Sequence, residues 1–394
     1  MIDDNRKPGY TGTVDTLPRH DLRHEDGRVL HVYGAYDGSP LVPAAPGDPG
    51  GPAPVHLRRN RLTGAWVAIS PARNVRPQAR AGDTGGPACP LCPGGPEVPF
   101  GYDAAVFDNR FPTLLPDPPA PPDDLGADAA PARGRCEVVL YTPTHTGSLA
   151  TLTPTELARV VAVWTDRSRE LRADPSHRYV LVFENRGEEV GATLPHPHGQ
   201  IYALAHLPAP LARRVERLHE HRRRNGRCLT CEVVADDLAA AERALGHNAS
   251  FTVGVPFAPD WPFEVHVRAR RHGVRSLTDL TAEERRDLAA GLRDVVRRYD
   301  RIDDAPAAYM MVCHQSPLGH DGEEVADWHL GFEFLPPRRA AGKHKVRASV
   351  ETATGLFIND TVPESSAAEL RGLTADDDPP PDPSAFPDLE IARG

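Results

Sequence analysis

The sequence predicts an α+β protein built from two similar halves, and an internal repeat is the main evidence for it. Residues 145–156 and 272–283 share one pattern: a histidine, then leucines, then a threonine at which a helix begins. The two segments lie about 127 residues apart, counted from His145 to His272, and a helix pattern followed by an apolar strand comes after each. A repeat at this distance indicates a duplicated strand–helix–strand unit. The alternative is a chance likeness between two amphipathic helix starts.

The expected elements follow from the spacing of apolar residues. Short apolar runs predict strands over residues 28–33, 137–141, 179–183 and 308–312. Thr153 and Glu156 form the signature of a capping box, so the first helix is expected from there to about Leu171. The second helix is expected over residues 282–299.

Composition divides the chain into four parts. We expect a flexible N-terminal segment over residues 1–55 and a disordered tail over residues 371–394, because both ends are rich in Pro, Gly and Asp. Between them we expect an N-terminal half over residues 56–225 and a C-terminal half over residues 226–370.

The overall balance of residues argues against two classes of partner. A net charge of −10 argues against non-specific binding to nucleic acid. No apolar run approaches the ~18 residues that a membrane-spanning helix needs. The first residues are polar and lack a secretory signal pattern, so a cytoplasmic location is expected.

Four of the six cysteines form two C-x-x-C pairs, at Cys89, Cys92, Cys228 and Cys231. In a reducing compartment such pairs indicate metal binding more than disulfides. Both pairs together could form a Cys₄ zinc site, or the first pair could combine with His145 and His196. Spacing alone does not decide between these alternatives.

Residue types that suit phosphate chemistry occur together in His196-Pro-His-Gly-Gln200. In an extended strand, His196 and His198 lie on one side, roughly 7 Å apart. If a closed metal site takes His196, the metal has a structural role and aims His198, which is the candidate nucleophile toward phosphorus. Gly199 would let an anionic group approach the backbone. The competing interpretation is a pair of solvated loop histidines.

Gln200 also bears on the type of reaction. With Thr193 and nearby backbone N–H groups, its amide could donate hydrogen bonds to phosphate oxygens. A glutamine cannot act as a general acid, and a leaving group that is itself a phosphate needs none. These properties favour transfer between sugar phosphates over hydrolysis.

Taken with further motifs, these residues resemble the galactose-1-phosphate uridylyltransferases, a branch of the histidine-triad superfamily. The resemblance extends from about Arg58 to Leu370 and rests above all on the spacing of two motifs, Phe183-Glu-Asn-Arg-Gly187 and Pro195-His-Pro-His-Gly-Gln200. The other motifs, in chain order, begin at Arg61, Cys89, Val106, Trp261, Cys313 and Phe357.

The resemblance implies a fold, an assembly and an activity. The fold would be two histidine-triad-like halves with a mostly antiparallel sheet and flanking helices, and the assembly a homodimer. The activity would be that of a UDP-glucose–hexose-1-phosphate uridylyltransferase in galactose metabolism. In its ping-pong reaction, UDP-glucose loads UMP onto His198 and releases glucose 1-phosphate, and galactose 1-phosphate then takes the UMP.

The resemblance also implies roles for individual residues. One structural Zn²⁺ per chain would be held by Cys89, Cys92, His145 and His196. His198 and Gln200 would be catalytic. Residues implied to contact the nucleotide are Arg73, Arg76, Asn109, Asn185, Gly191, Thr193 and Gln200. Lys345 and Glu351 match positions that reach the sugar across a dimer interface.

The chain departs from this pattern in its C-terminal half. Some members carry a second metal held by one glutamate and three histidines. Here His314 matches one ligand, but Gly331 and Glu333 occupy two histidine positions and Arg214 lies near the glutamate position. We therefore do not expect a complete second metal site. Cys228 and Cys231 are expected to be a structural pair or accessory ligands, and His329 a hydrogen-bonded polar group.

Three other functions stay open at this stage. The same histidine could transfer a different nucleotide, or serve a different sugar-phosphate acceptor. A nucleotide hydrolase is a rival from another reaction class, which Gln200 argues against. A zinc-stabilised nucleotide-binding protein without activity is the third.

Overall fold

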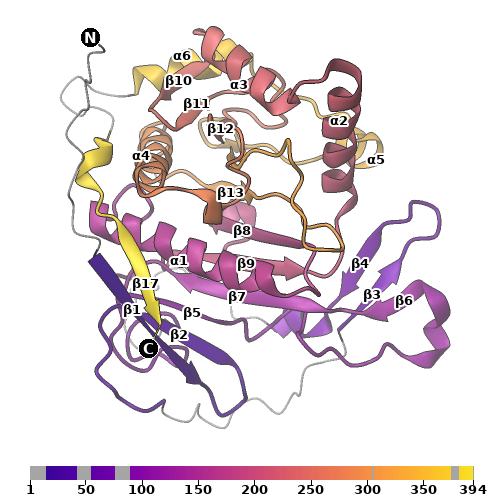
Figure 1. The fold of residues 1–394 in the computed structure, drawn as a ribbon, viewed down its shortest axis with the longest axis vertical. Helices are drawn as coiled ribbons and strands as arrows, with labels where there is room; N and C mark the ends of the chain where they lie inside the picture. The colour runs from indigo at the N-terminus through magenta and orange to yellow at the C-terminus, as the bar shows by residue number, and fades with distance from the viewer. Residues whose placement is uncertain (1–14, 42–54, 76–88, 304–305, 374–380, 394) are drawn as a thin grey trace, which may run out of the picture.

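The computed structural model describes residues 15–41, 55–75, 89–303, 306–373 and 381–393. Within them one twelve-stranded sheet runs through the molecule in the order β10-β11-β12-β14-β13-β8-β9-β7-β5-β2-β1-β17 (Figure 1). All neighbouring strands in it are antiparallel except β1 and β17, which are parallel. The expected α+β fold with a mostly antiparallel sheet is confirmed.

The strands of each half lie together in this sheet. The N-terminal half and the segment before it contribute β1 (Asp15–Arg23), β2 (Val29–Tyr33), β5 (Ala104–Asp108), β7 (Gly134–Leu140), β8 (Tyr179–Arg186) and β9 (His198–Leu204). The C-terminal half contributes β10 (Ala244–His247), β11 (Phe251–Gly254), β12 (Val265–Ala269), β13 (Tyr309–His314) and β14 (Gly331–Leu335), and β17 (Leu389–Arg393) completes the sheet. Two small sheets are separate from it: β3 (His56–Arg59), β4 (Trp66–Ile69) and β6 (Ala129–Pro131) form one, and β15 (Arg338–Ala340) and β16 (Lys343–His344) the other.

The two helices of the repeat, α1 (Pro154–Ala173) and α4 (Ala282–Tyr299), contact each other. Each begins with a full capping box, made by Thr153 with Glu156 in α1 and by Thr281 with Glu284 in α4. The threonine-led helix starts of the repeat are therefore confirmed. The other helices are α2 (Ala209–Asn225), α3 (Leu229–Ala239), α5 (Ser349–Thr354) and α6 (Pro363–Gly372).

A continuous apolar core joins the two halves. Trp164 of α1 is fully buried, and its ring lies 6.1 Å from that of Phe332 on β14. Both belong to one large cluster of buried side chains that also contains residues of β8, β9 and α4. The sheet and the core therefore hold the two halves as one packed unit.

The expectations for the two ends of the chain need correction. We expected residues 1–55 to be flexible and residues 371–394 to be disordered, but β1, β2 and β17 extend the central sheet. The ends are polar and rich in Pro and Gly. A strand was expected over residues 28–33, but the pairing of β1 with β17 and of β2 with β5 joins residues far apart in sequence, and local pattern gave no sign of it. Residues 1–14, 42–54, 374–380 and 394 lie outside the described residues.

A buried ion network ties both ends to α1. The carboxylate of Asp166 accepts hydrogen bonds from Arg19 at 2.9 Å, from Arg393 at 2.9 Å and from the hydroxyl of Tyr33 at 2.9 Å. Burial alone would raise the pKa of Asp166, but these partners lower it below its usual value. A buried carboxylate needs such partners, so the network fixes where β1, β2 and β17 dock.

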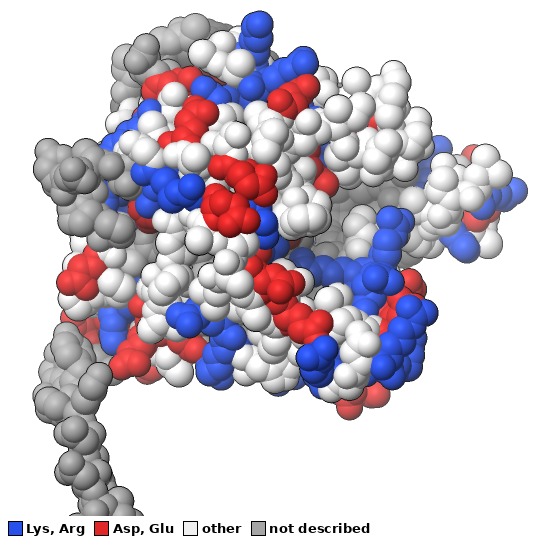
Figure 2. Space-filling model, turned by 90° about the horizontal axis from the view of Figure 1, so that it is seen from above, with Lys and Arg blue, Asp and Glu red and all other residues white. Residues whose placement is uncertain are grey.

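The surface and the helices bear on the expected partners. Figure 2 shows Lys and Arg side chains next to Asp and Glu over much of the face seen there. Among the described residues, no helix has the length and apolarity needed to cross a membrane.

Candidate active site and metal centres

The predicted catalytic residues lie on β9, which pairs with β7 on one side and β8 on the other. Side chains alternate along it, so His198 and Gln200 lie on the half-buried face while Gly199 and Ile201 face the core. His198 is the first residue of the strand, opposite Leu140 of β7. We predicted a strand that contains both His196 and His198, but the strand begins at His198, and His196 lies just before it.

The hydrogen bond of the His198 ring defines which nitrogen is available. Its Nδ1 lies 2.7 Å from the backbone carbonyl oxygen of His196. A carbonyl oxygen only accepts hydrogen bonds, so Nδ1 carries the proton and donates. In the neutral ring, Nε2 then keeps its lone pair, and this is the atom that a nucleophilic histidine uses.

Gly199 has a packing role that we did not expect. A Cβ atom at this position would lie 2.1 Å from the hydroxyl oxygen of Tyr141, which is fully buried, and 3.0 Å from the carbonyl oxygen of Phe183. The missing side chain therefore allows close packing beneath the strand, on the face opposite His198.

A surface cavity brings several predicted residues together with His198. Asn109, Thr193 and Gln200 line this cavity, which we call the His198 pocket. Sequence reasoning missed its other walls, which are formed by Pro90, Leu91, Glu97, Phe107, Arg110, Phe111, Val138 and Leu194. Apolar and aromatic walls with a few polar groups are typical of a small-molecule site. The motif that begins at Val106 contains Asn109, but no local pattern in the sequence shows that its apolar residues face His198.

The other predicted nucleotide contacts lie on neighbouring elements. Arg73 is in a short 3₁₀ helix and donates hydrogen bonds to Thr113 at 3.1 Å and to the hydroxyl of Tyr202 at 3.4 Å. Tyr202 shares the half-buried face of β9 with His198 and Gln200. Asn185 is near the end of β8, and Gly191 adopts a left-handed conformation after a short 3₁₀ helix. Arg76 lies outside the described residues.

Lys345 and Glu351 form a buried ion pair with each other. The ammonium nitrogen of Lys345 lies 2.6 Å from a carboxylate oxygen of Glu351, and this hydrogen bond lowers the pKa of Glu351 to about 2. Neither residue is among the described residues that line the His198 pocket. Within one chain, the structure therefore does not bring this pair to His198.

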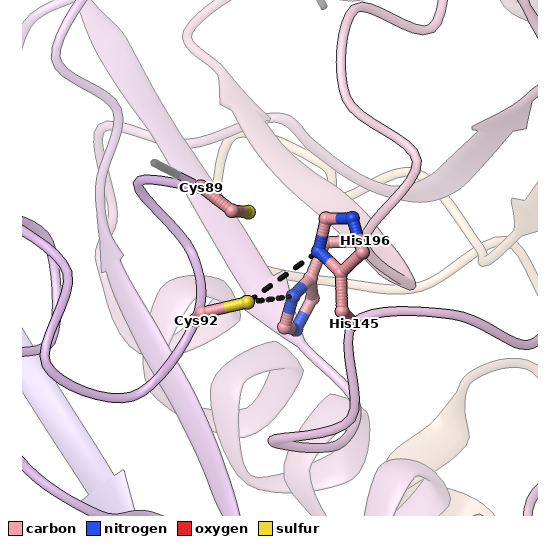
Figure 3. Close-up of side chains that lie close together, drawn as sticks. All are labelled: Cys89, Cys92, His145 and His196. Carbon is pink, nitrogen blue, oxygen red and sulfur yellow. Dashed lines mark hydrogen bonds between the residues drawn. The ribbon is translucent and has the colours of Figure 1, made fainter. Parts of the chain in front are cut away.

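Figure 3 shows that Cys89, Cys92, His145 and His196 point toward one another. All four ligand atoms lie within 4.8 Å of one another. The Sγ atom of Cys92 is 3.4 Å from Nδ1 of His145 and 3.5 Å from Nδ1 of His196. The alternative Cys₄ arrangement is wrong, because each cysteine pair has its own two histidines.

The chemistry of this first group suits a metal ion. A tetrahedral zinc ion separates its sulfur and nitrogen ligand atoms by about 3.6 Å, close to the measured distances. His196 donates from Nε2 to the carbonyl oxygen of Thr142 at 2.9 Å, which leaves Nδ1 unprotonated and directed at Cys92. Burial lowers the pKa of His196 to about 4, so its ring is neutral, as a ligand must be.

A second group of the same composition occurs in the C-terminal half. Its members are Cys228, Cys231, His272 and His329, with all ligand atoms within 4.8 Å of one another. The Sγ atom of Cys231 is 3.3 Å from Nε2 of His329 and 3.5 Å from Nδ1 of His272. His329 donates from Nδ1 to the carbonyl oxygen of Ala269 at 2.9 Å, which leaves Nε2 free for a ligand bond.

This second group bears on two expectations. We expected His329 to be a hydrogen-bonded polar group, but it lies among candidate ligands; the second site that we did not expect was one of a glutamate and three histidines, and this group is a different one. The signal was present in the repeat, where His145 corresponds to His272, and in the second C-x-x-C pair. Combining these two observations would have found three of the four residues.

The two halves differ at the position of His198. His196 and His329 each come two residues before an equivalent strand, β9 or β14. Counting from them, Gly331 corresponds to His198 and Glu333 to Gln200. The C-terminal half therefore repeats the group of candidate ligands but has no residue like His198 at this position.

The positions that a glutamate and three histidines would occupy instead hold an ion network. Burial alone would raise the pKa of Glu333, but the charge of His314, 3.1 Å away, lowers it well below its usual value. Arg214 adds a further positive charge 3.6 Å from Glu333. The guanidinium group thus provides a cation beside this carboxylate.

Comparison with family models identifies both halves. The family described as galactose-1-phosphate uridyl transferase, N-terminal domain, matches residues 53–208, and its C-terminal domain matches residues 214–377. The galactose-1-phosphate uridylyltransferase of Thermotoga maritima is 38% identical over 320 residues, which are 80% of this chain and 98% of that protein. That of Streptomyces lividans is 34% identical over 327 residues, 80% of this chain and 86% of that protein.

Solved structures agree with this result. A uridylyltransferase structure superposes with a TM-score of 0.72 at 32% identity, over 81% of this chain and 98% of that one. An ADP-glucose phosphorylase from Arabidopsis thaliana with bound ADP-glucose superposes with a TM-score of 0.62. At 23% sequence identity, this similarity shows that the two proteins share a fold.

The packing beneath β9 leads to a prediction about Gly199. Gly199→Ala should destabilise the protein by about 1–3 kcal/mol, because the added methyl group overlaps the hydroxyl of Tyr141. The double variant Gly199→Ala/Tyr141→Phe should recover part of that loss. Gly246→Ala is the matched control, since a Cβ there meets no atom within 4 Å. Denaturant unfolding measures all three, and an unchanged stability of Gly199→Ala would contradict the packing argument.

Proposed function

Because this chain belongs to the galactose-1-phosphate uridylyltransferase family, we propose that it moves UMP from UDP-glucose to galactose 1-phosphate through a covalent intermediate on His198. The observation that carries this proposal is the hydrogen bond from Nδ1 of His198 to the carbonyl oxygen of His196. It holds the ring in one orientation and leaves Nε2 as the nucleophile. The His198 pocket beside it offers room for a nucleotide.

In the first half-reaction, Nε2 of His198 attacks the α-phosphorus of UDP-glucose. An N–P bond forms, and the bond from that phosphorus to the bridging oxygen breaks. The electron pair leaves with glucose 1-phosphate, which departs as a phosphate and needs no proton. The ring becomes positively charged, and the carbonyl oxygen of His196 stabilises this charge by accepting a hydrogen bond from Nδ1.

In the second half-reaction, a phosphate oxygen of galactose 1-phosphate attacks the same phosphorus. The N–P bond breaks, and its electron pair returns to Nε2. No general acid or base is needed in either half-reaction, which suits the neutral amide of Gln200 in the wall of the pocket. The amide would donate to a non-bridging phosphate oxygen and would not carry a proton to the leaving group.

The nucleotide contacts belong to the same proposal. Asn109, Thr193 and Gln200 would contact UMP from the walls of the pocket, and Leu91, Phe107 and Val138 offer apolar surface to the base. Arg73, Arg76, Asn185 and Gly191 would complete the contacts to the ribose and phosphates. Arg73 is supported by its hydrogen bond to Tyr202, which lies on the same face of β9 as Gln200.

We further propose a cytoplasmic homodimer in which Lys345 and Glu351 reach the sugar in the partner subunit's site. The ion pair in one chain is separate from the described walls of the His198 pocket, which suits a role in a second subunit. Large apolar side chains are exposed nearby, at Val346, Leu356 and Ile358. The cysteines of the structure are free thiols, as a reducing compartment allows.

Mixing two inactive variants tests this assembly. His198→Ala and Lys345→Ala dimers should each lack transfer activity. After denaturation and refolding together, half of the dimers are mixed, and each mixed dimer has one intact site. The mixture should therefore regain about a quarter of the wild-type activity. No recovery, despite mixed dimers seen by native mass spectrometry, would place both residues in one chain.

For the metal we propose zinc in both Cys₂His₂ groups, with a structural role. Four protein ligands close each site, so no position is left for a substrate. In the first group the ion would hold the ring of His196, whose carbonyl oxygen positions His198. In the second group it would join the start of α3 to the segment before β14 through Cys228, Cys231 and His329.

Metal analysis tests this proposal without any activity measurement. Purified wild-type protein should contain two zinc ions per chain, and His145→Ala or His329→Ala should each contain one. His314→Ala is the control and should keep two, because it lies in neither group. One zinc ion in the wild type, or two in His329→Ala, would contradict the second site.

The central prediction concerns the covalent intermediate. Incubation with uracil-labelled UDP-glucose should attach one UMP per chain, and peptide mass spectrometry should locate it on His198. His198→Ala should fold, keep its zinc and attach no label, whereas the exposed control His219→Ala should behave as wild type. Label bound to another residue, or to none, would refute the mechanism.

The same assay identifies the nucleotide and the acceptor. Adenine-labelled ADP-glucose should leave no label on His198. A panel of hexose 1-phosphates added to the loaded protein should show galactose 1-phosphate as the most rapid acceptor. Rapid release of UMP by water alone would indicate a hydrolase.

A further inference from the structure

Residues that the family models do not match pack behind one wall of the His198 pocket. The models begin at residue 53, so β1 and β2, which together we call the N-terminal hairpin, lie outside them. Strand β2 pairs with β5, where Leu30 is opposite Phe107. Phe107 lines the His198 pocket, and Leu30 packs in the same apolar cluster as Leu91 and Val138 of the pocket wall.

A charged pair crosses from the hairpin to the pocket. The guanidinium nitrogen Nη1 of Arg28 lies 2.6 Å from a carboxylate oxygen of Glu97, and it also donates to the backbone carbonyl oxygen of Asp108 at 3.2 Å. Glu97 lines the His198 pocket and is only 6% exposed. The side chains of Arg28 and Glu97 are 14% and 8% exposed, so solvent screens this pair little.

Contacts of neighbouring residues fix the position of the N-terminal hairpin beside the pocket. The backbone N–H of Val29 donates to the carboxylate of Asp108 at 2.8 Å, and Arg135 of β7 donates to the same carboxylate at 2.9 Å. At the far side of the hairpin, Arg19 is paired with Asp166 of α1. The hairpin is therefore fixed at both its edges.

If the His198 pocket binds a nucleotide, it must admit an anion, and the ion pair of Arg28 with Glu97 then has a function. A nucleotide brings negative phosphates into a cavity whose wall contains the carboxylate of Glu97. If that carboxylate lacked a cation, it would repel the phosphates across a partly desolvated space. Arg28 offsets this charge from behind, where it occupies none of the pocket's described lining. Its Nε also pairs with Asp26 at 2.7 Å, but that carboxylate is half exposed to solvent, whereas Glu97 is buried.

We propose that Arg28 is a positioning residue that neutralises Glu97 and thereby allows the His198 pocket to bind a nucleoside monophosphate tightly. This inference rests on the proposed function only in taking the ligand to be a nucleotide. It assigns to the N-terminal hairpin a role in nucleotide affinity, and it leaves the chemical step at His198 unchanged. The family-model segments lack this hairpin, so the role belongs to the extension of this chain.

The test compares nucleotide affinity in four variants of the full chain by titration calorimetry with UMP. Arg28→Ala should weaken UMP binding at least about tenfold, because a charge-assisted hydrogen bond is lost and Glu97 is left unpaired. Arg28→Lys should recover much of the affinity. Arg28→Ala/Glu97→Gln should also recover it, because no charge is then left to neutralise. Arg23→Ala is the matched control, since this exposed arginine of the same hairpin donates to the carbonyl oxygen of Gly27.

Kinetics separates this role from a general loss of structure. In transfer assays, Arg28→Ala should raise KM for UDP-glucose at least about tenfold, with kcat changed less than about twofold. A variant that merely unfolds would lose kcat and melting temperature, and the Glu97→Gln change would not restore it. Equal UMP affinity in Arg28→Ala and Arg23→Ala, or additive losses in the double variant, would overturn the proposal.

The outcomes also separate this inference from the proposed function. If wild-type protein forms the uridylyl adduct but the Arg28 variants bind UMP normally, only the inference fails. If the Arg28 effect on UMP binding is present but no adduct forms on His198, only the transferase mechanism fails.

Discussion

The site depends on one residue that is held from two sides. The ring of His196 contributes to the first Cys₂His₂ group, and its backbone carbonyl oxygen accepts the hydrogen bond from Nδ1 of His198. Contacts that hold the His196 ring therefore also restrict the backbone of the residue that orients His198. Because the Nε2 of His196 also donates to the carbonyl oxygen of Thr142, the ring has one tautomer and one place. A nucleophile that must meet a phosphorus atom along one direction gains from such rigidity.

The duplication explains why the C-terminal half has a group of candidate ligands without a counterpart of His198. Both groups join a C-x-x-C turn, a loop histidine and a histidine just before a strand. Such a group joins separate segments of a half whatever side chain the following strand carries. Gly331 stands where the first half has His198, and the strand is kept.

The segments at the two ends of the chain add strands to the central sheet. Strands β1, β2 and β17 lengthen the sheet beyond the segments that the family models match, and Asp166 ties them to α1. One side of the hairpin meets the core and the other meets the wall of the His198 pocket through Arg28 and Glu97. A segment that a composition-based prediction assigned to flexible chain thereby contacts a residue in the wall of the His198 pocket.

Local pattern by itself determined the helices of the repeat, the strand of His198 and the C-x-x-C pairs as candidate metal ligands. Capping boxes, apolar spacing and the pair of histidines two residues apart act over a few residues, so they are visible in a single stretch of sequence. The resemblance to a known family then supplied the choice between a Cys₄ and a Cys₂His₂ site, which spacing had left open. Only the tertiary structure decided the second ligand group, the walls of the His198 pocket and the pairing of β1 with β17. Each of these joins residues that are distant in the chain, and what brings them together is the packing of one continuous sheet and core, which no local pattern encodes.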